Sequence, residues 1–195
     1  FDDVMMRIES ESRRMGTLVS DLLTLARLDE GQPLELSEVD LVELARNAQG
    51  DLQALDPSRK VEVEDLDGQP LNQAVIITAD RDKLTQVLVN LVGNVNQYTP
   101  AGSPVQIRVG VVGDRVVVQI RDHGPGITAD EQRRVFERFY RTDKSRSREK
   151  GGSGLGLAIV SGIVQAHQGE VQMRATPGGG LTVHIELKSL PKGVS

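Results

Sequence analysis

The chain of 195 residues contains no cysteine, which excludes disulfide bridges and any chemistry that needs a thiol. It therefore lacks the usual soft ligands of structural zinc sites, and its three scattered histidines do not replace them. No apolar run approaches the roughly 20 residues that a membrane-spanning helix needs. No stretch resembles a secretory signal peptide either.

The net charge argues against a protein that binds nucleic acid. The chain carries 23 basic and 28 acidic side chains, a formal charge of −5 at pH 7, which does not suit nucleic acid. Hydrophobic residues make up 38% and charged residues 26%, as in a globular protein rather than a disordered one. The length suffices for one ordinary domain and a short extra element. Because the chain opens at Phe1 inside a predicted helix, without an initiator methionine, we expect a fragment of a longer protein.

Residues 1–30 are predicted to form one long helix. Apolar side chains recur along it at steps of three, four or seven residues, apart from a polar gap near Glu11. A helix of this length extends beyond a small domain, and its apolar stripe needs a partner helix. Residues 31–36 begin with Gly-Gln-Pro, a helix stop, and form a linker. The stripe consists of Val4, Ile8, Met15, Leu18, Leu22 and Leu25.

Residues 37–190 mix helical and strand patterns, which indicates one α/β domain. Asp40 is expected to cap the first helix, and Thr128 with Glu131 forms a capping-box pattern. The predicted helices are 39–55, 81–98, 128–139 and 154–168. The predicted strands are 61–64, 74–78, 105–112, 115–121, 170–175 and 181–187, with hairpin turns at 113–114 and 177–180.

Two asparagines near the end of the predicted helix 81–98 are candidate ligands. Asn90 and Asn94 are four residues apart and therefore share one face of the helix. An amide oxygen is a neutral, hard ligand, suited to a Mg²⁺ ion that keeps several waters and bridges phosphates. The same spacing fits two polar residues on a solvated face, and alone it does not decide between the two interpretations.

A second candidate is Asp122, which directly follows a predicted strand and precedes Gly124 and Gly126. A carboxylate at a strand end can accept a hydrogen bond from the amino group of adenine. The two glycines allow the backbone to approach a flat base without an intervening Cβ atom. An ordinary turn remains the alternative, because this pattern alone is weak evidence.

A third candidate is the glycine-rich run of residues 151–157, which leads into a predicted helix. Free N–H groups at a helix start, with glycines that permit close approach, form a cradle for phosphate. No strand directly precedes the run, which argues against a dinucleotide-binding fingerprint, and no Gly-Lys-Ser/Thr follows, which excludes a P-loop. A flexible hinge stays open as the alternative.

A basic loop lies between the two glycine-rich segments, with five arginine or lysine residues from 138 to 148. Arg141 and Arg146 could reach triphosphate oxygens with forked hydrogen bonds. Phe136 and Phe139 are expected to anchor the base of the loop in the core. A solvated basic loop is the alternative, and it is weakened by the two flanking segments.

The order of the four segments within residues 90–160 is more specific than any one of them. It resembles the ATP-binding domain of sensor histidine kinases, in the superfamily that includes gyrase, MutL-type proteins and a family of chaperones. Residues 90–98, 122–126, 136–141 and 152–156 match its asparagine, first glycine, phenylalanine and second glycine boxes. The resemblance covers essentially residues 10–190. It implies an α/β two-layer sandwich, a mixed sheet faced by three helices and preceded by one long helix, with a lid at 140–152.

The resemblance implies binding of ATP with Mg²⁺. Asp122 would hold the adenine amino group, within the loop of Gly124 and Gly126. Asn94 would coordinate Mg²⁺, and Asn90 would line the phosphate site.

Further roles follow from the same resemblance. Tyr98 would pack or hydrogen-bond near the nucleotide, and Arg141 and Arg146 would approach the terminal phosphates. The hinge and the phosphate wall would be formed by Gly152, Gly154, Leu155 and Gly156.

Residues 1–30 resemble the second helix of the dimerisation and phosphotransfer hairpin. In the family, the first helix carries a histidine that attacks the γ-phosphate of ATP, and the phosphoryl group then passes to an aspartate of a response regulator. None of His123, His167 and His184 matches that acceptor, so we expect ATP binding without self-phosphorylation. The implied partners are ATP, a response regulator and a second copy of the parent protein, which the family places at a membrane with this part in the cytoplasm.

One departure from the family concerns Gln97, where many relatives carry a lysine or arginine that meets phosphate. Loss of that cation could cost about 1–2 kcal/mol of binding free energy, and Lys144 or Arg148 could compensate. An ATP-responsive interaction module without catalysis therefore stays open. An anti-sigma-type serine kinase is less compatible with the helix 1–30, and a gyrase- or MutL-like ATPase would need a second domain.

Overall fold

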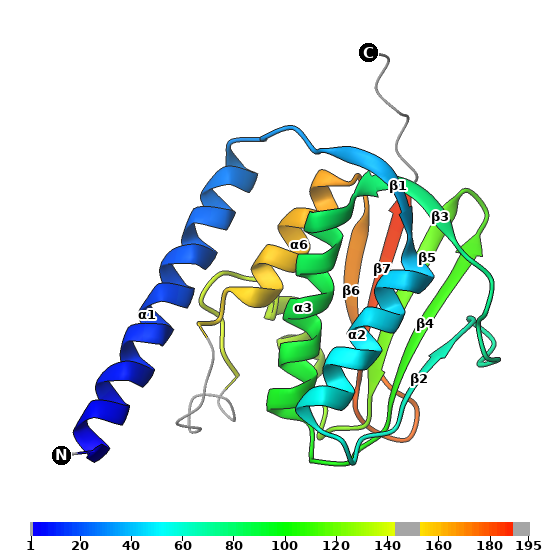
Figure 1. Ribbon diagram of the computed structural model, residues 1–195. Helices are drawn as coiled ribbons and strands as arrows, with labels where there is room; N and C mark the ends of the chain where they lie inside the picture. The colour runs from blue at the N-terminus through cyan, green and yellow to red at the C-terminus, as the bar shows by residue number, and fades with distance from the viewer. Residues whose placement is uncertain (1, 143–152, 189–195) are drawn as a thin grey trace.

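The structure, a computed structural model, describes residues 2–142 and 153–188 (Figure 1). Five strands form one mixed sheet in the order β2-β4-β5-β7-β6, in which β2 is parallel to β4 and the other neighbours are antiparallel. Two further strands, β1 (Leu36–Asp40) and β3 (Ile76–Asp80), form a separate antiparallel pair. The sheet strands are β2 (Val61–Glu64), β4 (Val105–Val112), β5 (Arg115–Asp122), β6 (Glu170–Ala175) and β7 (Leu181–Lys188).

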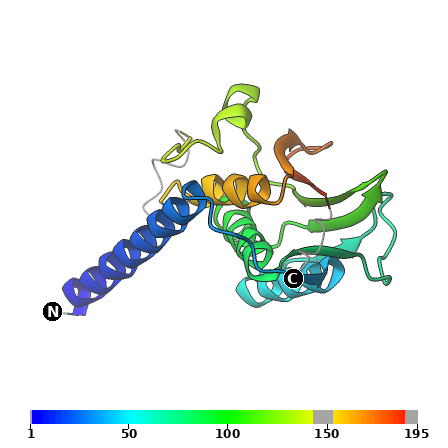
Figure 2. The same cartoon turned by 90° about the horizontal axis from the view of Figure 1, so that it is seen from above.

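Three helices cover one face of the five-stranded sheet (Figures 1 and 2). They are α2 (Leu41–Leu55), α3 (Arg81–Tyr98) and α6 (Gly156–Ala166), and a short helix, α4 (Ala129–Arg134), follows β5. The core lies between this helical layer and the sheet, because alternate residues of the strands point inward. In β4 these are Val105, Ile107 and Val109, none of which is exposed. The predicted two-layer α/β sandwich with three facing helices is thus confirmed.

The long helix α1 (Asp2–Asp29) leads away from the domain at its N-terminal end (Figures 1 and 2). Its C-terminal half packs on α6, where Leu25 is 4% exposed and Leu28 contacts Gly162. Towards the N-terminus the apolar stripe is open, and Ile8 and Met15 remain more than half exposed. None of the helices in the described ranges combines the length and apolar character needed to cross a membrane.

Several predicted boundaries differ from the observed ones. The helix predicted at 39–55 begins at Leu41, because the carboxylate of Asp40 caps it by accepting from Val42 N–H at 2.9 Å. The residues before it form β1, which was not predicted, and β3 begins two residues later than expected. The capping box of Thr128 and Glu131 is confirmed, although α4 ends at Arg134 rather than at residue 139.

The start of α6 also differs from the prediction of a helix from residue 154. Gly154 has a φ of +75°, a left-handed conformation that cannot belong to the helix, so α6 begins at Gly156. Residues 143–152 lie outside the described residues, and with them Arg146, Gly152 and most of the predicted lid at 140–152.

Candidate functional site

A pocket of about 410 Å³ opens between α1, α3, the loop after β5 and the first residues of α6. This volume lies within the range of roughly 300–1,000 Å³ that small-molecule sites occupy. The sheet supplies an apolar wall that includes Ile120, Met173 and Val183, while the helices and loops supply polar groups. One apolar side and a few convergent polar groups suit a ligand with a flat ring and a polar tail.

Eight of the predicted site residues come together in this pocket, although they are spread over 67 positions of the chain. They reach it from four segments: the second half of α3, the end of β5 with the loop after it, the residues that follow α4, and the start of α6. The eight are Asn90, Asn94, Tyr98, Asp122, Gly126, Arg141, Gly154 and Gly156.

Two predicted residues do not line this pocket. Gly124 belongs to a neighbouring shallow hollow beside Thr99, and its N–H donates to Asp122 Oδ1 at 2.8 Å. Leu155 is completely buried, because its apolar side chain joins the core at the start of α6. Both contribute to the shape of the site rather than to its surface.

The Asp122 carboxylate is held on one side only. Its Oδ1 accepts the N–H groups of Gly124 at 2.8 Å and of Leu181 at 3.1 Å. Among the described residues, no hydrogen bond is made to its Oδ2. A carboxylate that is fixed through one oxygen can offer the other to a donor in the pocket.

The two asparagines of α3 take different places. The Nδ2 of Asn90 donates to the carbonyl of Gly156 at 3.3 Å and so ties α3 to the first turn of α6. Asn94, one turn later, is half-buried and lines the pocket. The amide oxygen of Asn94 is the type of ligand that Mg²⁺ accepts alongside water and phosphate.

Gly154 joins the segment before α6 to the residues that follow α4. A Cβ atom at this position would lie 3.1 Å from the Cα and carbonyl carbon of Phe139 and 3.2 Å from the carbonyl oxygen of Tyr140. The carbonyl of Gly154 also accepts the N–H of Phe139 at 3.1 Å. Arg141, the residue after Tyr140, lines the pocket. The close approach at Gly154 therefore fixes the backbone position from which the Arg141 side chain extends.

The expected role of Phe139 as a core anchor is wrong. Its side chain is 58% exposed and its φ is +61°, whereas Phe136 is half-buried. The neighbouring Tyr140 ring is instead covered by Arg134, whose guanidinium carbon lies 4.6 Å from the ring centroid. The turn needed to bring Phe139 to Gly154 directs its side chain to solvent.

Helix α1 forms part of the pocket wall, which sequence reasoning missed. Thr17 and Asp21 line the pocket, and Asp21 Oδ2 accepts a hydrogen bond from Ser153 Oγ at 3.0 Å. Further along, the carboxylate of Asp29 accepts two bonds from Arg138 Nη2, at 2.6 and 2.8 Å. No local pattern marks these residues, because their role depends on how α1 lies against the domain.

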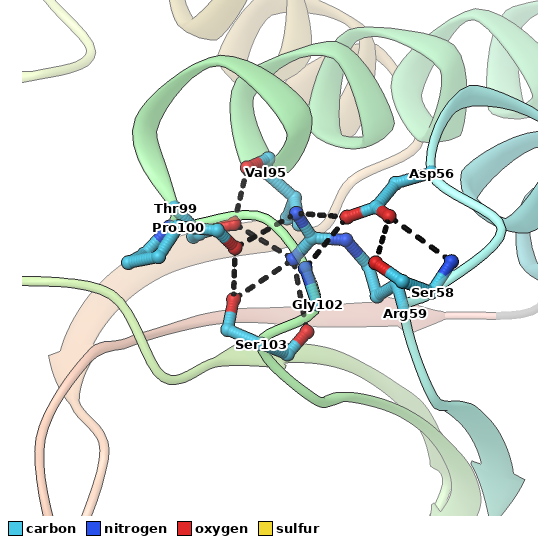
Figure 3. A network of polar contacts seen from close by, with 8 residues as sticks. All are labelled: Asp56, Ser58, Arg59, Val95, Thr99, Pro100, Gly102 and Ser103. Atoms are coloured by element: carbon cyan, nitrogen blue, oxygen red, sulfur yellow. Dashed lines mark hydrogen bonds and ion pairs between the residues drawn. The ribbon is translucent and has the colours of Figure 1, made fainter.

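A buried arginine fastens the end of α3, next to the pocket (Figure 3). Arg59 is 3% exposed, and its Nη1 donates to Thr99 Oγ1 at 2.8 Å and to Ser103 O and Oγ at 3.0 Å. Its Nη2 donates to Pro100 O at 3.2 Å and pairs with Asp56 Oδ2 at 3.3 Å. The Ser58 hydroxyl and the Gly102 N–H, which donate to Asp56, lower the pKa of its carboxyl.

None of the three histidines is among the lining residues of the main pocket. His123 contacts Gln106 Oε1 at 3.0 Å, and His184 lies between Gln119 and Glu186. His167 is buried between Asp80 and Ile163. Each of the three is instead held by hydrogen bonds to other groups of the domain.

Comparison with known proteins agrees with this geometry. Residues 79–191 match the family model of the histidine kinase-, DNA gyrase B- and HSP90-like ATPases. Over 174 residues the chain is 45% identical to "Probable sensor histidine kinase TcrY" of Mycobacterium tuberculosis. The aligned region makes up 89% of this chain and 36% of that protein.

Two solved structures share the fold. Full-length ShkA in complex with AMPPNP superposes with a TM-score of 0.77 at 28% identity, over 98% of this chain and 40% of that one. Histidine kinase ThkA, in complex with response regulator protein TrrA, gives a TM-score of 0.71 at 24% identity, over 94% of this chain and 50% of that one. The chain thus spans half or less of each of these three proteins.

Proposed function

This chain belongs to the histidine kinase-, DNA gyrase B- and HSP90-like ATPases, and on that basis we propose that it is the part of a two-component sensor histidine kinase that binds Mg·ATP and presents its γ-phosphate. The relative TcrY carries a sensor histidine kinase name, and ShkA was solved with an ATP analogue. The observation that carries the proposal is the convergence of Asn90, Asn94, Asp122 and Gly156 on one pocket.

The proposed division of the chain follows from this role. Residues 1–30 are the second helix of a dimerisation and phosphotransfer hairpin, 31–36 a linker and 37–190 the ATP-binding domain. The open apolar stripe of α1 favours a partner helix, because exposed apolar faces of helices associate. The parent protein is then a homodimeric sensor that is anchored in the membrane, with this part in the cytoplasm.

The adenine end of the nucleotide lies at Asp122 in this proposal. The carboxylate is held through Oδ1, and its Oδ2 accepts the exocyclic amino group of the base. The ring contacts the apolar wall of Ile120, Met173 and Val183. Adenine is thereby distinguished from bases that present a carbonyl at the same position.

The phosphates lie between α3 and the start of α6. The first turn of α6 has no side-chain cap, so its N–H groups and the positive end of the helix dipole are directed to anions. Arg141 adds a guanidinium at the pocket, where forked hydrogen bonds to phosphate are possible. Arg146 and Gly152, which fall outside the described residues, are proposed to complete this end.

The residues present fit a magnesium ion that arrives with the nucleotide. Within the described ranges no group of three His, Asp or Glu side chains could hold a metal ion. Mg²⁺ is commonly bound through one or two protein oxygens, several waters and substrate phosphates, and Asn94 supplies such an oxygen. The ion would neutralise charge on the phosphate oxygens.

The reaction proposed for the whole protein is phosphoryl transfer. A neutral imidazole nitrogen on the other hairpin helix attacks the γ-phosphorus, the bond to the bridging oxygen breaks, and ADP leaves. The N–P bond then breaks as an aspartate of a response regulator takes the phosphoryl group, a partner class seen with ThkA. This chain supplies position and electrostatics rather than the nucleophile.

The first test is calorimetric titration with a non-hydrolysable ATP analogue, with and without Mg²⁺, on the chain and on Asp122→Asn. We expect micromolar-range binding that Mg²⁺ strengthens and that falls at least tenfold in the variant, roughly the value of a hydrogen bond to a charged group. Absence of binding by the unchanged chain would exclude the proposal.

A binding module without catalysis is the second candidate, and it is favoured by one observation. Gln97, a neutral residue, lines the pocket where many relatives have a cation. Adding a hairpin helix with an acceptor histidine in trans, with ATP, separates the two candidates. Formation of phosphohistidine supports the kinase, whereas binding without phosphohistidine supports the module.

A further inference from the structure

The turn between β6 and β7 lies against the end of β5. Thr182 pairs with Arg121 in the ladder between β7 and β5, so the residues just before β7 reach Asp122. Three consecutive glycines form this turn, Gly178, Gly179 and Gly180, with φ angles of +87°, +114° and +104°. A side chain is therefore disfavoured by the backbone at all three positions.

Only one of the three glycines is enclosed. A Cβ atom at Gly178 or Gly179 would meet nothing within 4 Å. At Gly180 it would overlap the carbonyl oxygen of Asp122 and lie 2.7 Å from both the carbonyl carbon of Asp122 and the Cα of His123. These are backbone atoms, so no side-chain rotation can relieve the overlap.

The close approach at Gly180 allows the next residue to form a hydrogen bond with Asp122, at the candidate adenine site. Leu181, the next residue, donates its N–H to Asp122 Oδ1 at 3.1 Å. The same oxygen accepts the N–H of Gly124 at 2.8 Å from within the loop. Two donors from separate segments restrict the rotation of the carboxylate more than the Gly124 N–H alone would.

We propose that Gly180 is a positioning residue for purine selection: it lets the β6–β7 turn reach Asp122, so that Leu181 N–H orients the carboxylate towards the base. This inference rests on the proposed function. A fixed carboxylate favours adenine, which offers an amino donor, and disfavours hypoxanthine, which offers a carbonyl at the same place. Displacing the turn removes the bond and with it the orientation.

The test compares three variants that each place a side chain at a positive φ angle, Gly178→Ala, Gly179→Ala and Gly180→Ala. Affinities for non-hydrolysable analogues of ATP and of ITP are measured by calorimetry on the whole chain. We expect Gly180→Ala to lose about 10- to 100-fold in affinity for the ATP analogue, with its ATP-to-ITP ratio falling towards one. The other two variants should keep both quantities within about threefold of the unchanged chain.

The purine ratio separates this inference from the proposed function. No binding of the ATP analogue by the unchanged chain contradicts the function itself. Binding with a preference for ATP that Gly180→Ala retains in full contradicts the positioning role alone, and equal losses in all three variants do so too. A general loss of stability would lower both affinities together without changing their ratio.

A second measurement does not depend on folding of Gly180→Ala. Amide hydrogen exchange is followed at Leu181 in the unchanged chain and in Asp122→Ala. Exchange at Leu181 should accelerate when its acceptor is removed, while Gly179, whose N–H donates to Thr176 O at 3.0 Å, serves as the internal control. Unchanged exchange at Leu181, or equal acceleration at Gly179, would overturn the inference.

Discussion

Arg59 and Thr99, 40 residues apart in the chain, are joined by a hydrogen bond of 2.8 Å from the guanidinium to the hydroxyl. The Thr99 hydroxyl also donates to Val95 O at the end of α3, and the Thr99 methyl group packs beside Gly124. A buried cation in the loop after α2 thus holds the segment that connects α3 to β4, which lies beside the loop after Asp122.

Replacement of this guanidinium should be costly. We expect Arg59→Met to lower the free energy of unfolding by about 3 kcal/mol, because it removes a buried guanidinium that donates to oxygens of Pro100 and Ser103 and pairs with Asp56. Arg81→Met is the matched control, since Arg81 pairs with Glu43 at the surface and should cost less than about 1 kcal/mol. Urea unfolding measures both, and equal losses would contradict the assigned role.

Gly154 offers a test of how the start of α6 is set. We expect Gly154→Ala to lower stability and to weaken binding of the ATP analogue about tenfold or more, because the new Cβ presses on the backbone of Phe139 and Tyr140. Gly31→Ala has a similar positive φ of +64° but open space around it. It should show only the strain of about 1–2 kcal/mol in thermal unfolding, and unaltered affinity.

His167 predicts a dependence of stability on pH. Burial lowers its pKa, against the opposing effects of the Ile163 carbonyl and the Asp80 carboxylate. Its Nε2 accepts the N–H of Asp80 at 3.0 Å, which requires the neutral ring. A lowered folded pKa means that the unfolded state takes up the proton first, so stability is complete above about 6.5 and is lost as the pH falls below that value.

The measurement compares the unchanged chain with His167→Gln by urea unfolding between pH 7.5 and pH 5.5. The variant should be less stable at the upper end, and the difference should shrink as the pH falls, because only the unchanged chain loses the histidine contribution. His123→Gln controls for removal of a histidine as such. A difference that is constant or widens with falling pH would refute the assignment.

The contact between α1 and α6 can be tested with two leucines on one helix. Leu25 is 4% exposed and Leu22 is 41% exposed. We expect Leu25→Ala to cost about 2–3 kcal/mol and Leu22→Ala less than about 1 kcal/mol, because only the first leaves a cavity in a packed contact. Equal effects in urea unfolding would mean that α1 does not pack on the domain as described.

The helices and strands that could be predicted from the sequence are mostly those with a clear local residue pattern. Helix α3 was predicted to the residue, because the apolar positions Leu84, Leu88 and Leu91 repeat at helical spacing and Asp80 caps the start. Strand β1 was missed, because only Val39 of its five residues is buried and its pairing with Ile77 depends on a segment nearly 40 residues away. Tertiary pairing of this kind leaves little trace in a short segment.

The same contrast holds for the site. Asn90, Asp122 and Gly156 could be predicted to meet at one pocket because each stands in a local motif whose chemistry is recognisable. Asp21 could not, since nothing around it in the sequence differs from any other polar position on a helix. Gly180 was seen only as a turn residue, because its role depends on backbone atoms of Asp122 that lie 58 positions earlier.

The place of Asp21 and Thr17 in the pocket wall has a thermodynamic consequence. The pocket is closed partly by a helix that is joined to the rest of the domain through the residues between α1 and β1 and through the contact with α6. A ligand that touches both walls must change the free energy of docking α1 by as much as docking changes the free energy of binding, since linkage is reciprocal. Ligand binding in the pocket and docking of α1 are therefore coupled, and a change in one shifts the other.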